Sequence, residues 1–218
     1  MPAQDPTEPF DLVDADGVPL GLTKPRSLVH RDGDWHQSVH LWVVFDGAPP
    51  RVLLQRRAYD KDTHPGLVDV SVAGHLRAGE SPRDGLREAE EEVGLAVRPE
   101  DCVALGLRRA VHRAAGVVDR ELQHVFLVRT GVAFEALRPD PDEVAGLVLA
   151  PLDGLRALVE RGEPLAALER DGRGARAVTL TQEALVPSPD GYAARALASI
   201  ARRCAGGDEP YWRVGAPT

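Results

Sequence analysis

The segment from Gly74 to Leu95 constrains the fold and the chemistry of this chain more than any other part of its sequence. Its second half predicts a helix over about 82–93, because Ser81 is a favourable N-cap and Pro82 suits the first helical position. Gly94 follows, and glycine readily adopts the left-handed conformation that ends a helix. We therefore expect a loop that begins at Gly74 and leads into a short, well-delimited helix.

The two faces of this helix differ in chemistry. An i, i+3, i+7 spacing places three apolar residues on the face expected to be buried: Leu86, Ala89 and Val93. Another face carries three acidic residues at i, i+3 and i+4: Glu88, Glu91 and Glu92. Like charges at this spacing cost roughly a few tenths of a kcal/mol per pair. A bound Mg²⁺ would reverse that cost, since it prefers carboxylate oxygens; a solvated acidic face is the alternative.

These residues resemble the Nudix box of the Nudix hydrolase superfamily. The family pattern is Gly, five residues, Glu, seven residues, then Arg-Glu-apolar-x-Glu-Glu-x-Gly-apolar. This chain has Gly74, five residues and Glu80, followed later by Arg87 to Leu95 in the same pattern. It departs in one place, because six residues rather than seven separate Glu80 from Arg87. The loop or the first helical turn must therefore be one residue shorter.

The resemblance implies a site for one to three Mg²⁺ or Mn²⁺ ions. Glu88 and Glu92 would be the principal metal ligands, and Glu91 a ligand or the base that aligns water. The backbone carbonyl of Ala73 or Gly74 would complete the metal site.

Further residues are expected to act beside these ligands. Arg87 would orient a box glutamate through a salt bridge, and Glu121 is an additional ligand or base candidate, unless it is simply a polar residue opening a strand. Arg56 and Arg57 could clamp a distal phosphate, the alternative being a solvated strand end. We also count two residues of the box as substrate contacts: His75 and Glu80.

Residues 11–155 resemble one Nudix branch, which contains the type 1 isopentenyl-diphosphate isomerases and their hydrolase relatives. Those isomerases place a cysteine, which serves in proton transfer at carbon, just before the Gly-His pair. This chain has Ala73 there, and neither Cys102 nor Cys204 matches that position. We therefore expect a hydrolase that cleaves the diphosphate linkage of a nucleoside diphosphate derivative or related organic pyrophosphate. An isomerase-like enzyme and a non-catalytic nucleotide-binding module are the alternatives.

Other histidines and aromatic residues give weaker signals. His36 and His40 are four apart, which is a zinc spacing on a helix, but their segment is expected to be a strand. We therefore expect no zinc site there. The aromatic residues that could stack on a substrate ring are more often found in a core: Trp35, Trp42 and Phe126.

The chain of 218 residues is expected to form an α+β fold, a Nudix-type α/β/α sandwich with a mixed β-sheet. Strands are predicted at 38–45, 51–55, 68–73, 103–109, 121–129 and 144–150, and helices at 153–161, at 181–185 and from Asp190 onward. We divide the chain into an N-terminal tail and hairpin (1–30), the Nudix domain (31–160) and a C-terminal helical extension packed on that domain (161–218).

Composition limits the partners. A net charge of −8 argues against binding a nucleic acid duplex, and the sequence contains no apolar run long enough to span a membrane. The N-terminus lacks the pattern of a secretory signal, so a cytoplasmic location is expected. The expected partner is a small-molecule diphosphate. Tyr211 and Trp212 on a polar tail leave a homodimer open.

Overall fold

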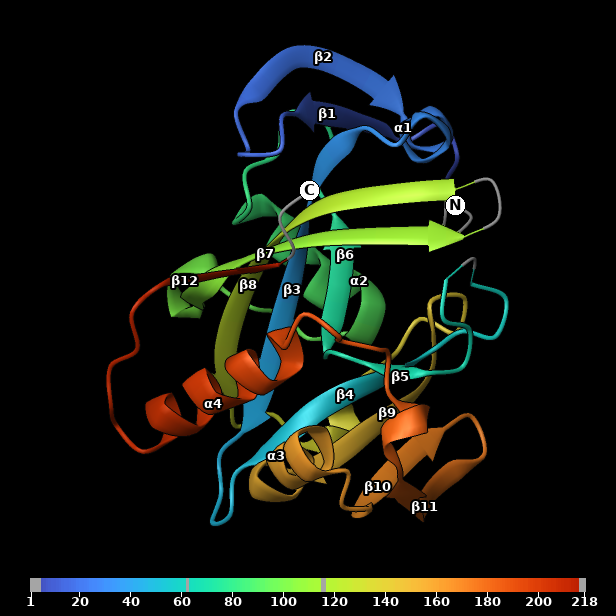
Figure 1. Cartoon of the computed structure of the whole chain (residues 1–218). Helices are drawn as coiled ribbons and strands as arrows, with labels where there is room; N and C mark the ends of the chain where they lie inside the picture. Colours follow the sequence, from blue (N-terminus) through green and yellow to red (C-terminus); the bar gives the residue numbers. More distant parts are fainter. Residues whose placement is uncertain (1–4, 62, 115–116, 216–218) are drawn as a thin grey trace.

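A computed structural model describes residues 5–61, 63–114 and 117–215, and a ten-stranded mixed sheet is its central element (Figure 1). Its strands are β3 (Trp35–Phe45), β4 (Arg51–Arg57), β5 (Val68–Asp69), β6 (Val72–His75), β7 (Val103–Ala114), β8 (Val117–Thr130), β9 (Val144–Pro151), β10 (Leu165–Asp171), β11 (Gly174–Leu180) and β12 (Trp212–Gly215). The strand order is β11-β10-β9-β4-β3-β8-β7-β12, with β5 paired to β4 and β6 paired to β3.

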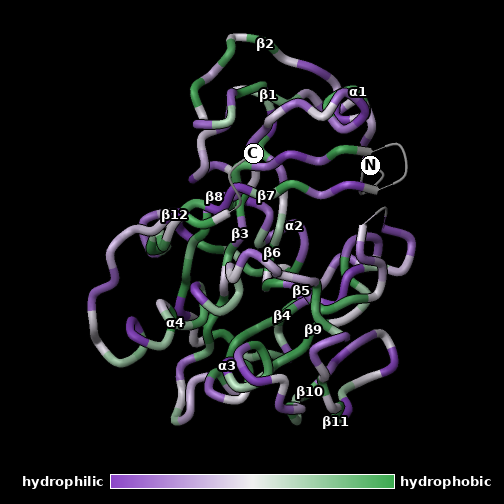
Figure 2. Tube along the Cα trace, viewed as in Figure 1, coloured by the Kyte–Doolittle hydropathy of each residue, from purple (hydrophilic) through white to green (hydrophobic). Residues whose placement is uncertain are grey.

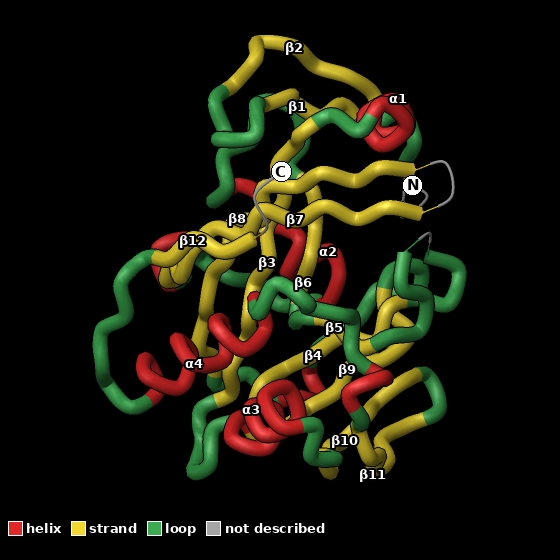
Figure 3. The backbone as a smooth tube through the Cα atoms, in the orientation of Figure 1, coloured by secondary structure: helices red, strands yellow, loops and turns green. Residues whose placement is uncertain are grey.

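Helices cover both faces of this sheet (Figures 1 and 3). On one face lies α2 (Glu88–Val93), whose apolar residues pack with Val39, Leu41 and Val43 of β3. On the other lie α3 (Leu152–Arg161) and α4 (Tyr192–Cys204), which pack with Trp42 and Val44 of the same strand. The alternation along β3 therefore separates two cores, and the expected α+β Nudix sandwich is confirmed.

The central strands are the most apolar part of the chain. Figure 2 shows hydrophobic residues concentrated along β3, β4 and β9, between the helices. The longest run of parallel pairing joins β3 to β8, from Trp35 with Arg120 to Phe45 with Thr130. By contrast, β3 and β4 pair only at Val44 with Val52 and Phe45 with Arg51 among the described residues. Beyond this point the two strands part, and β5 and β6 lie along them.

The expected box helix is divided in two. A 3₁₀ turn, η1 (Asp84–Arg87), precedes α2, so that the α-helix begins at Glu88 rather than near Pro82. A 3₁₀ turn uses fewer residues per turn than an α-helix. The helix predicted over about 82–93 is therefore α-helical only from Glu88 to Val93.

The N-terminal hairpin is confirmed as β1 (Pro9–Val13) and β2 (Pro19–Pro25). The side chain of Asp14 holds its turn, because it accepts hydrogen bonds from the backbone N–H groups of Asp16 and Val18 at 2.9 Å each. A short helix that the sequence analysis did not predict, α1 (Arg26–Asp32), follows. Residues 1–4 of the expected tail lie outside the described residues.

The C-terminal part contains more strand than expected. Residues 165–180 form the β10–β11 hairpin at one sheet edge, and β12 pairs with β7 at the other. The predicted helix 153–161 is confirmed as α3, and the segment 181–185 forms a 3₁₀ turn. The short 3₁₀ turns are η2 (Pro99–Asp101), η3 (Phe134–Ala136) and η4 (Gln182–Ala184). No helix among the described residues is long and apolar enough to cross a membrane.

Candidate active site

A cavity of about 1100 Å³ opens beside the box helix. Its walls come from the N-terminal segment 5–9, the box, the rim of β7 and the segment 186–190 that leads into α4. Acidic and basic side chains line it together, among them Glu88, Glu92 and Arg57. Its lining contains most of the site residues predicted above.

Gly74 has no side chain because the box helix approaches it closely. A Cβ atom at this position would lie 2.3 Å from Cδ of Glu88, which is closer than real Cβ contacts allow. The neighbouring backbone N–H of Ala73 donates a hydrogen bond to Oε2 of Glu92 at 3.1 Å. The same oxygen accepts a hydrogen bond from Nε2 of Gln55 at 2.9 Å. Ala73 and Gly74 of β6 therefore contact the two predicted principal ligands, Glu92 and Glu88.

Burial changes the acidity of both glutamates. Glu92 is only 5% exposed, and burial together with the charge of Glu88 raises its pKa to about 8. Burial also raises the pKa of Glu88, against the opposing effect of Arg87. Burial outweighs the positive charge of Arg87 near Glu88 and of Lys61 near Glu92, so additional positive charge would favour the ionised form of both carboxyls. The donor set of carboxylate and carbonyl oxygens fits a hard divalent cation such as Mg²⁺.

Arg87 lies at the centre of the acidic residues. Its guanidinium donates to both carboxylate oxygens of Glu80, at 2.7 and 3.0 Å, and to Glu88 at 2.6 Å and Glu91 at 2.8 Å. The shorter spacer therefore does not separate Glu80 from the helix. Glu91 is half exposed and is also contacted by Arg77 at 3.2 Å. Its predicted role as a ligand or base stays a prediction.

A second group of potential ligands lies in and against the wall of the cavity. The side chains of His30, His36, His75 and Asp119 come from α1, β3, β6 and β8, and their ligand atoms all lie within 4.8 Å of one another. We call these four residues the histidine cluster. The Nε2 atoms of the three histidines and Oδ1 of Asp119 are buried and have no hydrogen-bond partner among the described residues. Unpaired buried polar atoms are costly, so this donor set fits a cation bound by imidazole and carboxylate.

Two histidines of the cluster are in the neutral form that a metal requires, whereas Asp119 and Nε2 of His75 would first have to lose a proton. Burial lowers the pKa of His30 to about 4 and that of His36 below its usual value, so both imidazoles are neutral at pH 7. Burial and the charge of Glu121 raise the pKa of Asp119 to about 9. Nδ1 of His75 accepts a hydrogen bond from Arg26 at 3.2 Å, which places the proton of neutral His75 on Nε2. His75 would therefore have to lose this contact before Nε2 could bind a metal.

Glu121 lies beside the histidine cluster. Its carboxylate accepts hydrogen bonds from the hydroxyl of Ser38 and from Nε2 of Gln123, and it lies 3.9 Å from Nε2 of His75. Burial acts to raise its pKa, but the nearby imidazoles and Ser38 hold the pKa well below its usual range. Glu121 is thus an ionised carboxylate in the cavity wall, rather than a polar residue opening an exposed strand.

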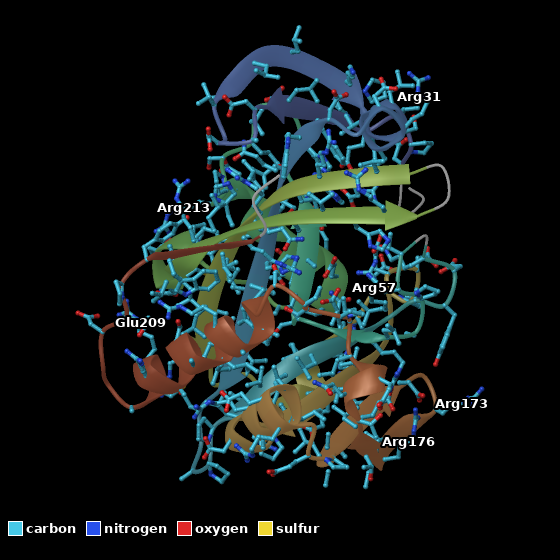
Figure 4. The ribbon with its side chains drawn as sticks, in the orientation of Figure 1. Arg31, Arg57, Arg173, Arg176, Glu209 and Arg213 are labelled. Atoms are coloured by element: carbon cyan, nitrogen blue, oxygen red, sulfur yellow. The ribbon has the colours of Figure 1, made fainter. Side chains whose placement is uncertain are left out.

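The two arginines of β4 have different surroundings. Arg57 lines the cavity, where it pairs with Asp69 at 3.2 Å and contacts the carbonyl of Thr63 at 3.0 Å (Figure 4). Arg56 forms an ion pair with the buried Glu169 and donates to the carbonyl of Gly66 at 2.8 Å. Among the described residues, the cavity lining includes Arg57 but not Arg56. A contact between Arg56 and a phosphate would require breaking its pair with Glu169.

The structure shows where the histidines and aromatic residues considered in the sequence analysis lie. His36 lies in the histidine cluster, whose other members are distant in sequence and do not include His40; the expectation that His36 and His40 form no zinc site stays a prediction. Nδ1 of His40 lies 3.0 Å from the hydroxyl of Tyr192. Trp42 and Phe126 are core residues, as the sequence analysis favoured. The sequence analysis did not name His30 or Asp119 as potential ligands. Their only local signals are that His30 precedes His36 by six residues and that Asp119 precedes Glu121 by two.

Comparison with known proteins places these features in a family. Residues 34–168 match the model of the NUDIX domain. An uncharacterized Nudix hydrolase of Clostridium acetobutylicum is 34% identical over 152 residues, covering 69% of this chain and 73% of that protein. Nudix hydrolase 3 of Arabidopsis thaliana is 35% identical over 163 residues, covering 72% of this chain and 21% of that longer protein. The chain therefore belongs to the Nudix family, in which its homologues indicate a hydrolase acting on pyrophosphate bonds.

The relatives also include isomerases. An isopentenyl-diphosphate Delta-isomerase of Mycolicibacterium vanbaalenii is 36% identical over 163 residues, covering 74% of this chain and 87% of that protein. A crystal structure from Deinococcus radiodurans has a TM-score of 0.53 at 21% identity and covers 72% of this chain and 91% of that one. That likeness supports the fold alone. The sequence resemblance to the isomerase branch is thus confirmed, and the choice of reaction depends on the site.

Proposed function

We propose that the chain is a divalent-metal-dependent hydrolase that cleaves the diphosphate linkage of a nucleoside diphosphate derivative or a related organic pyrophosphate. The observation that carries the proposal is the group of box carboxylates around Arg87, with the buried Glu92 and the partly buried Glu88 against Ala73 and Gly74 of β6. Mg²⁺ or Mn²⁺ would be held by Glu88, Glu92 and a carbonyl of Ala73 or Gly74, with Glu91 as a further ligand.

The residues of the chain have separate tasks in this proposal. Bound divalent ions neutralise charge on phosphoryl oxygens and lower the pKa of water. Arg87 fixes the carboxylates of Glu88 and Glu91, so that their orientation does not depend on side-chain rotation. Arg57 and Lys61 line the same cavity and offer positive charge to the phosphates. Glu91 or Glu121 accepts the proton of the attacking water.

Burial at Lys61 is consistent with binding an anion. Lys61 forms an ion pair with Glu143, and burial lowers its pKa to about 8. At pH 7 it still carries a positive charge for the most part. Lysine binds phosphate as a compact point charge, whereas arginine binds it in a forked geometry. Arg57 and Lys61 are therefore the proposed phosphate contacts, in preference to Arg56.

The histidine cluster supports binding of a second, softer cation. Imidazole ligands suit Zn²⁺ or Fe²⁺ better than they suit Mg²⁺. The cluster borders the cavity through His30, His75 and Asp119, so a cation there would add positive charge beside Glu121. We propose that the protein binds this cation in addition to the ions at the box.

Isomerisation is the second candidate function, and the similarity to an isopentenyl-diphosphate Delta-isomerase favours it. It requires a group that transfers a proton at carbon, and Ala73 has none. Cys102 is buried in the core beside α2, and Cys204 lies on α4, so neither replaces a cysteine at position 73. The intact box carboxylates favour hydrolysis, and so does the methyl side chain of Ala73, which cannot transfer a proton.

The test is a substrate screen with the purified full chain. The protein is incubated with nucleoside diphosphate derivatives, nucleoside triphosphates and isopentenyl diphosphate, with Mg²⁺, with Mn²⁺ or with EDTA, and products are separated by ion-exchange chromatography. We expect phosphate or a monophosphate to be released only with a divalent ion, and Glu92→Gln to abolish release. Glu90→Gln, which removes an exposed charge from the same helix, is the matched control.

Three results would contradict the proposal. Release of no product from any compound would leave no hydrolase function to assign. Tight binding without turnover, unchanged by Glu92→Gln, would identify a non-catalytic nucleotide-binding module. Formation of the allylic isomer from isopentenyl diphosphate would identify an isomerase.

A further inference from the structure

His40, which belongs to neither group of potential metal ligands, is hydrogen-bonded to the C-terminal helix α4. His40 is 6% exposed, lines the cavity from β3, and has its Nδ1 atom 3.0 Å from the hydroxyl of Tyr192. Tyr192 is the first residue of α4, and the indole Nε1 of Trp42 donates to the same hydroxyl at 3.0 Å. The three side chains form a buried hydrogen-bonded chain from the core to the cavity wall.

The chemistry of these groups fixes the direction of each hydrogen bond. An indole N–H can only donate, so the phenolic oxygen of Tyr192 accepts from Trp42. The hydroxyl has one proton left to place, and among the described residues its other partner is Nδ1 of His40. If Nδ1 were the donor instead, the buried hydroxyl proton of Tyr192 would be unpaired, which is costly. The hydroxyl therefore donates to Nδ1, and the ring proton of His40 lies on Nε2.

The position of Tyr192 is itself held from the cavity wall. Arg108 on β7 pairs with both carboxylate oxygens of Asp190, at 2.7 and 3.1 Å, and its guanidinium lies 4.5 Å from the centre of the Tyr192 ring. Asp190 in turn accepts a hydrogen bond from the backbone N–H of Tyr192 at 3.4 Å. The start of α4 is thus fixed against β7, although it lies outside the residues that match the family model.

His40 lies next to the proposed reaction site. In the sheet it is the partner of Ala73, beside the glycine that contacts Glu88. Its face of β3 also carries Ser38, two residues away, whose hydroxyl holds Glu121. Charged groups face the imidazole from the surrounding strands: Arg57, Asp69, Arg108 and Glu121. His40 lines the same cavity as the box glutamates and the proposed phosphate contacts, Arg57 and Lys61.

We propose that His40, held by Tyr192 as the Nε2–H tautomer, is a substrate-binding residue that donates a hydrogen bond to a phosphoryl oxygen of the bound diphosphate. Tyr192 is then a positioning residue, and the C-terminal segment completes the binding site. A neutral donor with one proton in a fixed place favours an oxygen acceptor and disfavours a cationic group. This inference depends on the proposed function only for the identity of the ligand.

The hydrogen bond from Tyr192 to His40, and the tautomer it imposes on His40, are tested without any substrate. Two-bond ¹H–¹⁵N correlation spectra at pH 7 report which ring nitrogen of each histidine carries the proton, and His40→Gln identifies the His40 signals. We expect the proton on Nε2 in the wild type, a changed distribution in Tyr192→Phe, and no change in Tyr211→Phe, which removes an exposed hydroxyl. A proton on Nδ1 in the wild type, or an unchanged pattern in Tyr192→Phe, would overturn the assignment.

The ligand is tested with methylenediphosphonate and Mg²⁺, a diphosphate analogue that cannot be hydrolysed at its bridge. Loss of a hydrogen bond to a charged acceptor predicts that His40→Leu raises the dissociation constant about tenfold or more. His40→Gln, which retains an N–H donor, should stay within about threefold, and Tyr192→Phe should raise it about twofold if half the molecules then hold the wrong tautomer.

Two binding results would overturn the proposal. One is equal affinity of the wild type and a folded His40→Leu, with folding judged by spectral dispersion. The other is loss of affinity in His40→Gln as complete as in His40→Leu. If the wild type itself does not bind the probe, the ligand assignment is wrong. The substrate screen then judges the hydrolase proposal separately, since hydrolysis of another compound is compatible with that result.

Discussion

Replacing Glu92 by glutamine should make the metal-free protein more stable at high pH. Burial raises the pKa of Glu92 from its ordinary value of 4.5 to about 8. Between these two values the unfolded chain has lost this proton while the folded protein keeps it. The stabilisation is complete below pH 4.5 and is lost as the pH rises to 8, at about 1.4 kcal/mol per pH unit. Glutamine has nearly the same shape and does not titrate.

The magnitude follows from that slope. From pH 5 to pH 8 the variant should gain on the wild type by up to about 4 kcal/mol, or about 10 °C in melting temperature for a chain of this size. Urea unfolding in EDTA at pH 5, 6, 7 and 8 measures the difference directly. Glu90→Gln removes an exposed charge from the same helix and should show no such trend. A difference that is equal at pH 5 and pH 8, or a variant less stable at pH 8, would refute the reasoning.

Adding Mg²⁺ should reverse the order. The wild type gains stability from an ion bound by the ionised carboxylate, in proportion to the logarithm of ion concentration over dissociation constant. The variant lacks this ligand and should gain little. The wild type should therefore become more stable than Glu92→Gln as Mg²⁺ is added. Such a crossover would show that the ionised carboxylate of Glu92 destabilises the metal-free protein and binds Mg²⁺.

Three further changes test the site and its support. Gly74→Ala should displace the carboxylate of Glu88 while the fold persists, because the new Cβ meets a flexible side chain. We expect kcat/KM to fall by about 10²-fold. Unchanged activity would show that the position of Glu88 is not critical. Gly106→Ala places a Cβ 2.3 Å from the buried Trp212 ring and should cost about 1–3 kcal/mol in urea unfolding because the site is overpacked. Gly131→Ala, with open space around it, is the control. Asp119→Asn should remove one equivalent of Zn²⁺ or Mn²⁺ in equilibrium dialysis; equal stoichiometry in both proteins would exclude the histidine cluster as a metal site.

Much of the box region could be predicted because its signals are local. The i, i+3, i+4 spacing of the glutamates, the apolar stripe that includes Leu86, and Gly94 depend only on neighbours in the sequence. The strands of the central sheet followed from alternation, and the structure extends most of them by a few residues. The division of the box helix into η1 and α2 was not predicted. Gly85 of η1 packs so closely on the core that a Cβ there would lie 3.0 Å from Val39 and 3.1 Å from Leu76, which no local pattern shows.

The remaining site residues depend on contacts that no local pattern contains. His30 lies on a short helix that follows the N-terminal hairpin, and it meets Asp119 through the pairing of β3 with β8. Whether Arg56 or Arg57 faces the cavity depends on strand orientation and on Glu169, which belongs to a hairpin that the sequence analysis did not predict. The hydrogen bond between His40 and Tyr192 joins residues that are 152 positions apart in the sequence.

The parting of β3 and β4 explains why both candidate metal sites and His40 share one cavity. The hydroxyl of Ser71 donates to the carbonyl of Leu53 on β4 at 2.5 Å and accepts from the N–H of Val43 on β3 at 2.8 Å, so it satisfies both strands where they no longer pair. The chain then enters β6, which carries Ala73, Gly74 and His75 to the gap. Backbone groups that a continuous sheet would use internally thereby become available to Glu92 from one side. On the other side the same strand presents His75 to the histidine cluster and lies beside His40, so one local opening of the sheet positions all three groups.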